Sequence, residues 1–305
     1  MISESLVEDE NKVPDGGWGW VIVFGATMTH FLLVGIARCL GVIYLCLRER
    51  YQSSAANTAW VASAFNTSRT LTAPLASMLC ERFGCRVVAY VGGLIFSVGL
   101  MISAFSTSLL FMLFSFGLLS GFGGVLVFTP AYIIVGEYFD KRKGTAMGLA
   151  TIGSGLGSLI FVPEFAVEKG FSHSEAALLL SVYGFTDLTI RFLCAFLFDL
   201  RGVRKERRYP FALVGIMFGI STIVISLMPD YGTLAIAMTF NALFESAFDS
   251  QRATVISEFV TRKQMSMAVG MMIASQGIGN ITGPPLAGTN ISSNPTINYS
   301  GNYDN

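Results

Sequence analysis

The sequence predicts an all-α polytopic membrane protein built from two bundles of helices. Hydrophobic residues make up 52% of the chain and charged residues 13%, which is well below the charged share of about 25% in a soluble domain. The apolar residues gather in segments of about 20, the length that a helix needs to cross a bilayer. Short links marked by Pro, Gly or charge separate these segments.

Nine segments qualify as candidate spans, and no long polar domain interrupts them. In chain order they are residues 19–46, 57–79, 87–107, 109–136, 144–163, 176–200, 210–228, 231–257 and 265–288. We divide the chain accordingly into a cytosolic N-terminal tail (1–15), an N-terminal helical bundle (16–163), a C-terminal helical bundle (164–289) and a polar external tail (290–305).

The distribution of Lys and Arg predicts the orientation of these spans. One set of alternate loops carries thirteen basic residues and the other carries three. Basic loops remain in the cytosol, so we expect a cytosolic N-terminus. Arg48 and Arg50, which follow the first span, are exceptions, because this orientation places them outside. The tail would then lie outside, where Asn290 and Asn298 each begin a glycosylation sequon.

Asp187 and Arg191 are the most informative residues of the chain. They lie four residues apart in an apolar span, a spacing that places both side chains on one face of a helix. A charged side chain in hydrocarbon costs about 2.5–3.5 kcal/mol, so it is rarely kept without a use. The pair predicts a proton-accepting carboxylate beside a fixed positive charge, the chemistry that a carrier of small anions needs. A salt bridge that only holds the helices together is the alternative.

Other polar residues within spans point to a shared polar interior. Four positive and three negative groups cannot all face lipid; they are Arg38, Arg69, Asp187, Arg191, Glu245, Asp249 and Arg252. We expect Glu245, Asp249 and Arg252, which share one helix face, to line a pore together with His30, or else to form internal salt bridges. A lone histidine in a span is more often a packing residue than a proton relay. We interpret Arg69 as a brace between helices.

Several classes of function are excluded by what the sequence lacks. A formal net charge of zero argues against a nucleic-acid binder. The five cysteines show no metal-ligand spacing, and no nucleophile lies in a pattern with a base, so we expect no metal, no cofactor and no enzyme. The run from Gly153 to Gly157 resembles a phosphate loop, but no strand precedes it. Small residues at this spacing instead predict close helix packing.

Two motifs carry a resemblance to a known family. The first, at the start of the first span, matches the pattern [DE]-G-[GS]-[WF]-[GA]-W and consists of Asp15, Gly16, Gly17, Trp18, Gly19 and Trp20. The second opens the fifth span with Tyr138, Phe139, Asp140, Lys141 and Arg142, followed by Ala146, Gly148, Leu149, Ala150, Gly153 and Gly157. It departs from the family pattern at Lys143, Thr145 and Ile152. Both motifs resemble signatures of the monocarboxylate transporter family, solute carrier family 16, within the major facilitator superfamily.

The resemblance implies a function and roles for individual residues. Residues 183–191 look like the family's eighth helix, which would make Asp187 the proton-binding residue and Arg191 a substrate-binding residue. Arg38 falls where proton-coupled members keep a lysine, which implies a second substrate-binding position. By resemblance, the chain is a proton-coupled plasma membrane symporter of monocarboxylates or similar small organic solutes. A single-pass immunoglobulin-like chaperone is the partner that the family implies.

The chain also departs from the twelve-helix plan of the family. Residues 157–160 run directly into 161–164, which resembles the end of the seventh helix. The resemblance therefore implies that helix 6, most of helix 7 and helix 12 are absent. The alternative function is therefore a non-transporting truncated isoform, acting as an assembly or dominant-negative partner on a transporter scaffold. The sequence shows no filter-like loop that would indicate a channel and no ligand-binding ectodomain that would indicate a receptor.

Overall fold

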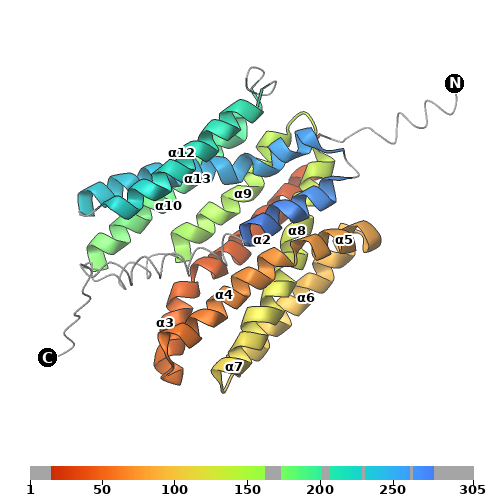
Figure 1. Ribbon diagram of the computed structural model, residues 1–305. Coiled ribbons are helices and arrows are strands. Elements are labelled where there is room, and N and C mark those ends of the chain that lie inside the picture. The colour runs from red at the N-terminus through yellow and green to blue at the C-terminus, as the bar shows by residue number, and fades with distance from the viewer. Residues whose placement is uncertain are drawn as a thin grey trace, which may run out of the picture.

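The computed structural model describes residues 15–161, 173–200, 203, 206–228, 231–261 and 264–277. Within these ranges all regular secondary structure is helical, as the sequence predicts. Figure 1 shows the helices running roughly along one another in two groups, with α9 and α2 between the early helices and the group formed by α10, α12 and α13.

The first bundle holds the five spans predicted between residues 19 and 163. Its helices are α2 (Gly19–Arg38), α3 (Leu40–Tyr51), α4 (Ala55–Leu71), α5 (Ala73–Phe83), α6 (Cys85–Ala104), α7 (Leu109–Met112), the π-helical η1 (Leu113–Ser120), α8 (Gly121–Tyr138) and α9 (Lys143–Phe161). The second predicted span is thus broken at Thr72, because Pro74 in the first turn of α5 cannot donate a backbone hydrogen bond.

The second bundle begins with α10 (His173–Leu197), α12 (Arg208–Leu227) and α13 (Tyr231–Phe259). A further helical stretch, residues 264–277, follows. This stretch packs across the bundle boundary, since Ser266 donates a hydrogen bond to the backbone oxygen of Ser77 in α5 at 3.0 Å. The two bundles are therefore joined both there and where α9 meets α10.

Four helices in the described ranges are long and apolar enough to cross a membrane: Gly19–Arg38, Cys85–Ala104, Leu109–Tyr138 and Arg208–Ile225. This is fewer than the nine predicted spans. Parts of the predicted spans 144–163 and 265–288 lie outside the described residues. Helices α4, α10 and α13 carry the charged residues that the sequence assigns to a polar interior.

Close contact between α2 and α9 depends on two glycines of the second motif. A Cβ atom at Gly153 would lie 1.9 Å from the carbonyl oxygen of Thr27, and one at Gly157 would lie 2.8 Å from that of Phe31. No other residue fits at these distances, so the predicted close helix packing is confirmed. The glycine run serves helix contact, because small residues allow two backbones to approach.

The two family motifs pack against each other at one end of the molecule. Oδ1 of Asp15 accepts hydrogen bonds from the backbone N–H groups of Asp140 and Lys141 at 2.8 and 2.9 Å. The rings of Trp20 and Phe139 lie 5.0 Å apart. A carboxylate at the start of a helix satisfies free N–H groups and favours the positive end of the helix dipole. Asp15 therefore links the start of α2 to the start of α9.

We call this end of the molecule the basic end, defined by residue 84 and residues 139–142, 198–200 and 206–207. Trp18, Arg86 and Tyr138 line one groove there, and Asp199 contacts the start of α9. Loops that the sequence places on one side of a membrane thus lie together, as alternating short connections require. Which side of the membrane the basic end faces stays a prediction.

Candidate functional site

A cavity of about 310 Å³ lies between the two bundles. Its size is near the lower end of ligand pockets, which span about 300–1,000 Å³. Its wall draws on α2, α4, α8, α9, α10, α13 and residues 264–277 through Val34, Ala37, Arg38, Asn66, Arg69, Thr70, Phe128, Tyr132, Ser154, Arg191, Glu245, Asp249, Arg252, Ile273 and Gln276. The site is polar and positively charged, and both bundles contribute to it.

Asp187 and Arg191 form the ion pair that their spacing predicts. Nε of Arg191 lies 2.9 Å from Oδ1 of Asp187, and both residues are 2% exposed. The hydroxyl of Ser246 on α13 also donates to Oδ1 of Asp187. Oδ2 of Asp187 is buried without a hydrogen-bond partner. Arg191 lines the cavity whereas Asp187 lies just outside its wall.

Asp249 joins this pair to a second arginine. Its Oδ2 lies 3.6 Å from an Nη atom of Arg191, and its Oδ1 lies 3.2 Å from an Nη atom of Arg252. Arg252 in turn donates to the hydroxyl of Tyr132 on α8 at 3.4 Å. The predicted polar face of α13 therefore points into the cavity and connects α10 with the first bundle.

Arg38 enters the cavity from the first bundle. Its Nη2 lies 3.5 Å from Oε1 of Glu245, and the Arg38 side chain keeps 36% exposure. The other oxygen of Glu245 accepts a hydrogen bond from the hydroxyl of Tyr183 on α10. Arg38 and Arg191, the two predicted substrate-binding arginines, thus lie at the same cavity.

Arg69 has a more direct position in the cavity than its interpretation as a brace implies. It lines the wall, and its Nε is buried without a hydrogen-bond partner. The one contact of its guanidinium in the described residues is with the ring of Phe128, 5.4 Å away. The sequence of α4 could have indicated this position, because the helix contains no acidic residue that could pair with Arg69.

His30, which the sequence offered as a possible pore-lining residue, is not among the residues that line this cavity. Its ring is 1% exposed and packs 4.8 Å from the rings of both Phe128 and Tyr132. Nδ1 lies 2.8 Å from the carbonyl oxygen of Ala26 in the same helix. The two aromatic rings separate the imidazole from the cavity, so the geometry is that of a packing residue.

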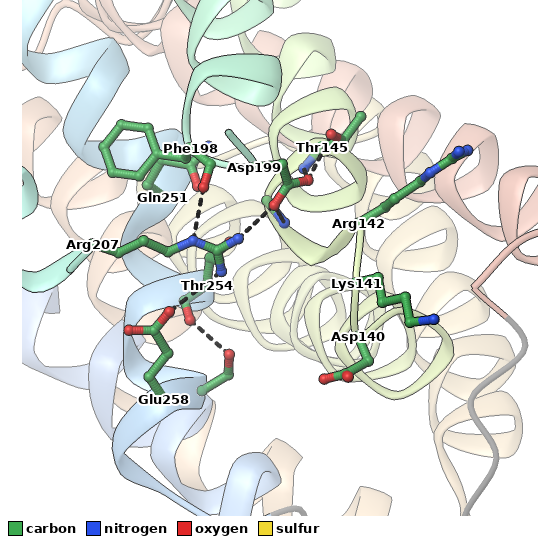
Figure 2. Close-up of polar contacts among 12 residues, drawn as sticks. Asp140, Lys141, Arg142, Thr145, Phe198, Asp199, Arg207, Gln251, Thr254 and Glu258 are labelled. Atoms are coloured by element: carbon green, nitrogen blue, oxygen red, sulfur yellow. Dashed lines mark hydrogen bonds and ion pairs between the residues drawn. The ribbon is translucent and has the colours of Figure 1, made fainter. Parts of the chain in front are cut away.

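A second group of charges, which we call the basic-end cluster, consists of Thr145, Asp199, Arg207 and Glu258. Asp199 accepts hydrogen bonds from the backbone N–H and the hydroxyl of Thr145, both at 2.6 Å. Arg207 lies 2.5 Å from Asp199 and 3.4 Å from Glu258, and it donates to the carbonyl oxygen of Phe198 at 2.8 Å. Figure 2 shows these contacts converging on Asp199 and Arg207.

The basic-end cluster was not predicted. The sequence pattern counted the basic residues around position 207 only for orientation, and it marked Thr145 only as a departure from the family motif. In the structure Thr145 is the residue through which α9 binds Asp199 at the end of α10. Lys141 and Arg142 of the motif extend away from this cluster (Figure 2).

Comparison with known proteins agrees with the predicted family. The family model of the Major Facilitator Superfamily matches residues 20–163 and 158–295. Monocarboxylate transporter 12 of Xenopus laevis is 38% identical over 169 residues, covering 55% of this chain and 36% of the relative. Monocarboxylate transporter 11 of Homo sapiens is 41% identical over 150 residues, covering 49% of this chain and 32% of the relative.

Monocarboxylate transporter 4 of Gallus gallus aligns more widely, at 25% identity over 366 residues, covering 91% of this chain and 77% of the relative. This alignment is longer than the chain itself, which has 305 residues, so the relative contains residues within the aligned region that this chain lacks. The two family matches meet at residues 158–163, where the sequence predicts that helices 5 and 7 are fused.

These relatives are named as transporters, in agreement with the prediction that the chain is not an enzyme. The alignments cover about a third of the Xenopus and human relatives. The helical architecture, the two motifs and the two-part match over most of the residues lead to one assignment. The chain belongs to the Major Facilitator Superfamily.

Proposed function

We propose that this chain is a secondary active carrier of monocarboxylates or similar small organic anions. The observation that carries the proposal is the cavity between the bundles, into which arginines from both bundles project. Arg38 supplies positive charge from the first bundle and Arg191 from the second. A guanidinium in a site with little water attracts a carboxylate strongly and can bind it through two parallel hydrogen bonds.

We propose that transport is coupled to protons through Asp187. Oδ1 of this carboxylate is held by Arg191 and Ser246, while Oδ2 is buried without a partner. Oδ2 is the oxygen at which this carboxylate would accept a proton, because the contacts with Arg191 and Ser246 are both made by Oδ1. Protonation of Asp187 would also weaken its attraction for Arg191, so proton binding would change the field in the cavity.

Rocking of the two bundles about a central site would carry the anion across. The contacts of Asp199 with Thr145 connect α10 to α9 at the basic end. Release of cargo at that end requires these contacts to break. The basic-end cluster therefore acts, in this proposal, as the closure of one side of the carrier.

Uptake of labelled lactate and pyruvate into cells that express this chain tests the proposal, with and without an inward proton gradient. We expect saturable uptake that increases with the gradient. Asp187→Asn should abolish the response to the gradient, because the amide does not take up a proton. Equal uptake by expressing and control cells, with the chain shown at the surface, would contradict the carrier function.

We also propose that the chain resides in the plasma membrane, with its basic end in the cytosol. The support is the excess of Lys and Arg in the loops at that end. Glycosylation of Asn290 or Asn298 in cells would place the C-terminal tail outside. A tag after Asn305 that antibodies reach only after permeabilisation would contradict this orientation. Co-purification with a single-pass immunoglobulin-like protein would identify the chaperone that the resemblance implies.

A second candidate function is a non-transporting partner of a longer carrier. The specific support is that the chicken relative has residues inside the aligned region that this chain lacks. Co-expression with that relative distinguishes the two functions. A partner would lower lactate uptake by the relative and show no uptake alone, whereas a carrier would add its own uptake.

A further inference from the structure

The charges around the cavity do not balance. We call Arg38, Arg69, Asp187, Arg191, Glu245, Asp249 and Arg252 the central charge cluster. It holds four arginines and three carboxylates, so it is short of one negative charge in the part of the chain that the structure describes. His30, which lies behind the cavity wall, carries no negative charge in either protonation state and does not correct the difference.

Arg69 accounts for this missing negative charge. Arg191 is held between Asp187 and Asp249, Arg252 pairs with Asp249, and Arg38 pairs with Glu245. Arg69 has no carboxylate within ion-pair distance among the described residues. Its contact with the ring of Phe128 compensates a buried guanidinium less than an anion does.

We infer that Arg69 is the direct partner of the cargo's carboxylate. This inference rests on the proposed function. The carboxylate of the cargo would supply the anionic partner that Arg69 lacks among the described residues. Arg38 and Arg191, already paired, set the positive field around the bound anion.

The surroundings of Arg69 fit a carboxylate. Asn66 lies one turn before it on α4, and Gln276 reaches the same cavity from the other bundle. Both side chains carry an amide N–H₂ that can donate to a carboxylate oxygen. An anion held by Arg69 and Gln276 together would bridge the two bundles, so binding would draw them toward each other.

The test is the thermal unfolding of the purified full chain with and without anions, at constant ionic strength. The probes are lactate, pyruvate and benzoate, with lactamide as the uncharged analogue. We expect the carboxylates, but not lactamide, to raise the Tm of the wild type, since a ligand that binds only the folded state stabilises it. Arg69→Gln should weaken this response by about tenfold or more in concentration, and Arg69→Lys should restore part of it.

The Tm without ligand separates a binding role from a structural one. Removing Arg69 strands no carboxylate, so Arg69→Gln should unfold at the wild-type temperature or above it. Arg208→Gln is the matched control, because Arg208 is exposed, forms an ion pair with Glu206 and is not among the residues that line the cavity. This variant should leave the response to lactate unchanged.

Two outcomes overturn different statements. A lactate response that survives in Arg69→Gln but is lost in Arg191→Gln would overturn the assignment of Arg69 alone. A wild type that responds to none of the three carboxylates would overturn the proposed function and the inference with it.

Discussion

The central charge cluster and the basic-end cluster contain the same kinds of side chain but differ in how completely the charges are paired. In the basic-end cluster the anions and cations satisfy one another, with Arg207 4% exposed between Asp199, Glu258 and a carbonyl oxygen. In the central charge cluster the guanidinium of Arg69 lies beside a cavity and has no anionic partner among the residues that the structure describes. Both clusters are buried and charged, so burial and charge do not distinguish a contact that joins helices from a ligand site. The difference is whether every charged group already has a partner of opposite charge.

The largest effect we expect within this comparison comes from breaking the most buried pair. Arg191→Ala leaves Asp187 as an uncompensated charge at 2% exposure, which should destabilise the fold by about 3–5 kcal/mol. A chemical or thermal unfolding curve of the purified protein measures this loss. Arg191→Lys should recover only part of the stability, because an ammonium does not reproduce the guanidinium's planar set of donors.

The double variant Asp187→Asn with Arg191→Gln tests the cause of that loss. It removes both charges, so it should be clearly more stable than Arg191→Ala alone. If both variants unfold together, the loss comes from packing around the arginine and not from a stranded carboxylate.

Asp199→Ala should have the next largest effect, because it removes the acceptor that α9 and Arg207 share. Hydrogen bonds to charged groups contribute about 1.5–3 kcal/mol, so we expect the basic end to open more often. Faster hydrogen–deuterium exchange at the amides of Gly144 and Thr145 measures this opening. Asp199→Asn keeps an acceptor and should show a smaller increase; unchanged exchange in both variants would show that other contacts hold this end closed.

Thr145→Val should produce a smaller effect of the same kind. It deletes one hydroxyl that donates to Asp199 at 2.6 Å and leaves the backbone N–H donor in place. Loss of a single hydrogen bond costs about 1 kcal/mol. Exchange at the start of α9 should therefore increase less than in Asp199→Ala. A larger increase would mean that the hydroxyl, and not the carboxylate, controls the contact.

The smallest effect should come from Arg38→Lys. Among the arginines of the central charge cluster that form an ion pair with a described residue, Arg38 is the most exposed. Its Nη2 lies 3.5 Å from Oε1 of Glu245. Partly exposed pairs of this kind contribute about 0–1 kcal/mol, so the Tm and the lactate KM should both change little. Arg38→Ala, which removes the charge, should raise the KM more. Equal effects of the two variants would indicate that position 38 requires the geometry of arginine.

Sequence patterns predicted those parts of the site that lie within one helix. The spacing of Asp187 and Arg191 fixes their contact because a helix brings residues four apart together. The link from Arg191 to Asp249 depends on how α10 and α13 turn toward each other, which no local pattern specifies. The contact of Thr145 with Asp199 joins residues far apart in the chain for the same reason.

The fold shows a similar division. The order of spans and the gathering of basic loops at one end follow from hydropathy and charge. The break at Thr72 was missed although Pro74 was available as a signal, because the apolar run continues through it. The unpaired state of Arg69 became visible only once every carboxylate around the cavity had been assigned a partner.

The contacts of Asp15 form only after a much longer part of the chain has been synthesised. Its carboxylate binds backbone groups that lie 125 residues later in the sequence. At a synthesis rate of about 5–20 residues per second, α9 follows Asp15 out of the ribosome by about 6–25 seconds. During that interval the first helix is in the membrane without the partner that fixes its end. A ribosome that pauses before residue 140 would prolong this exposed stage.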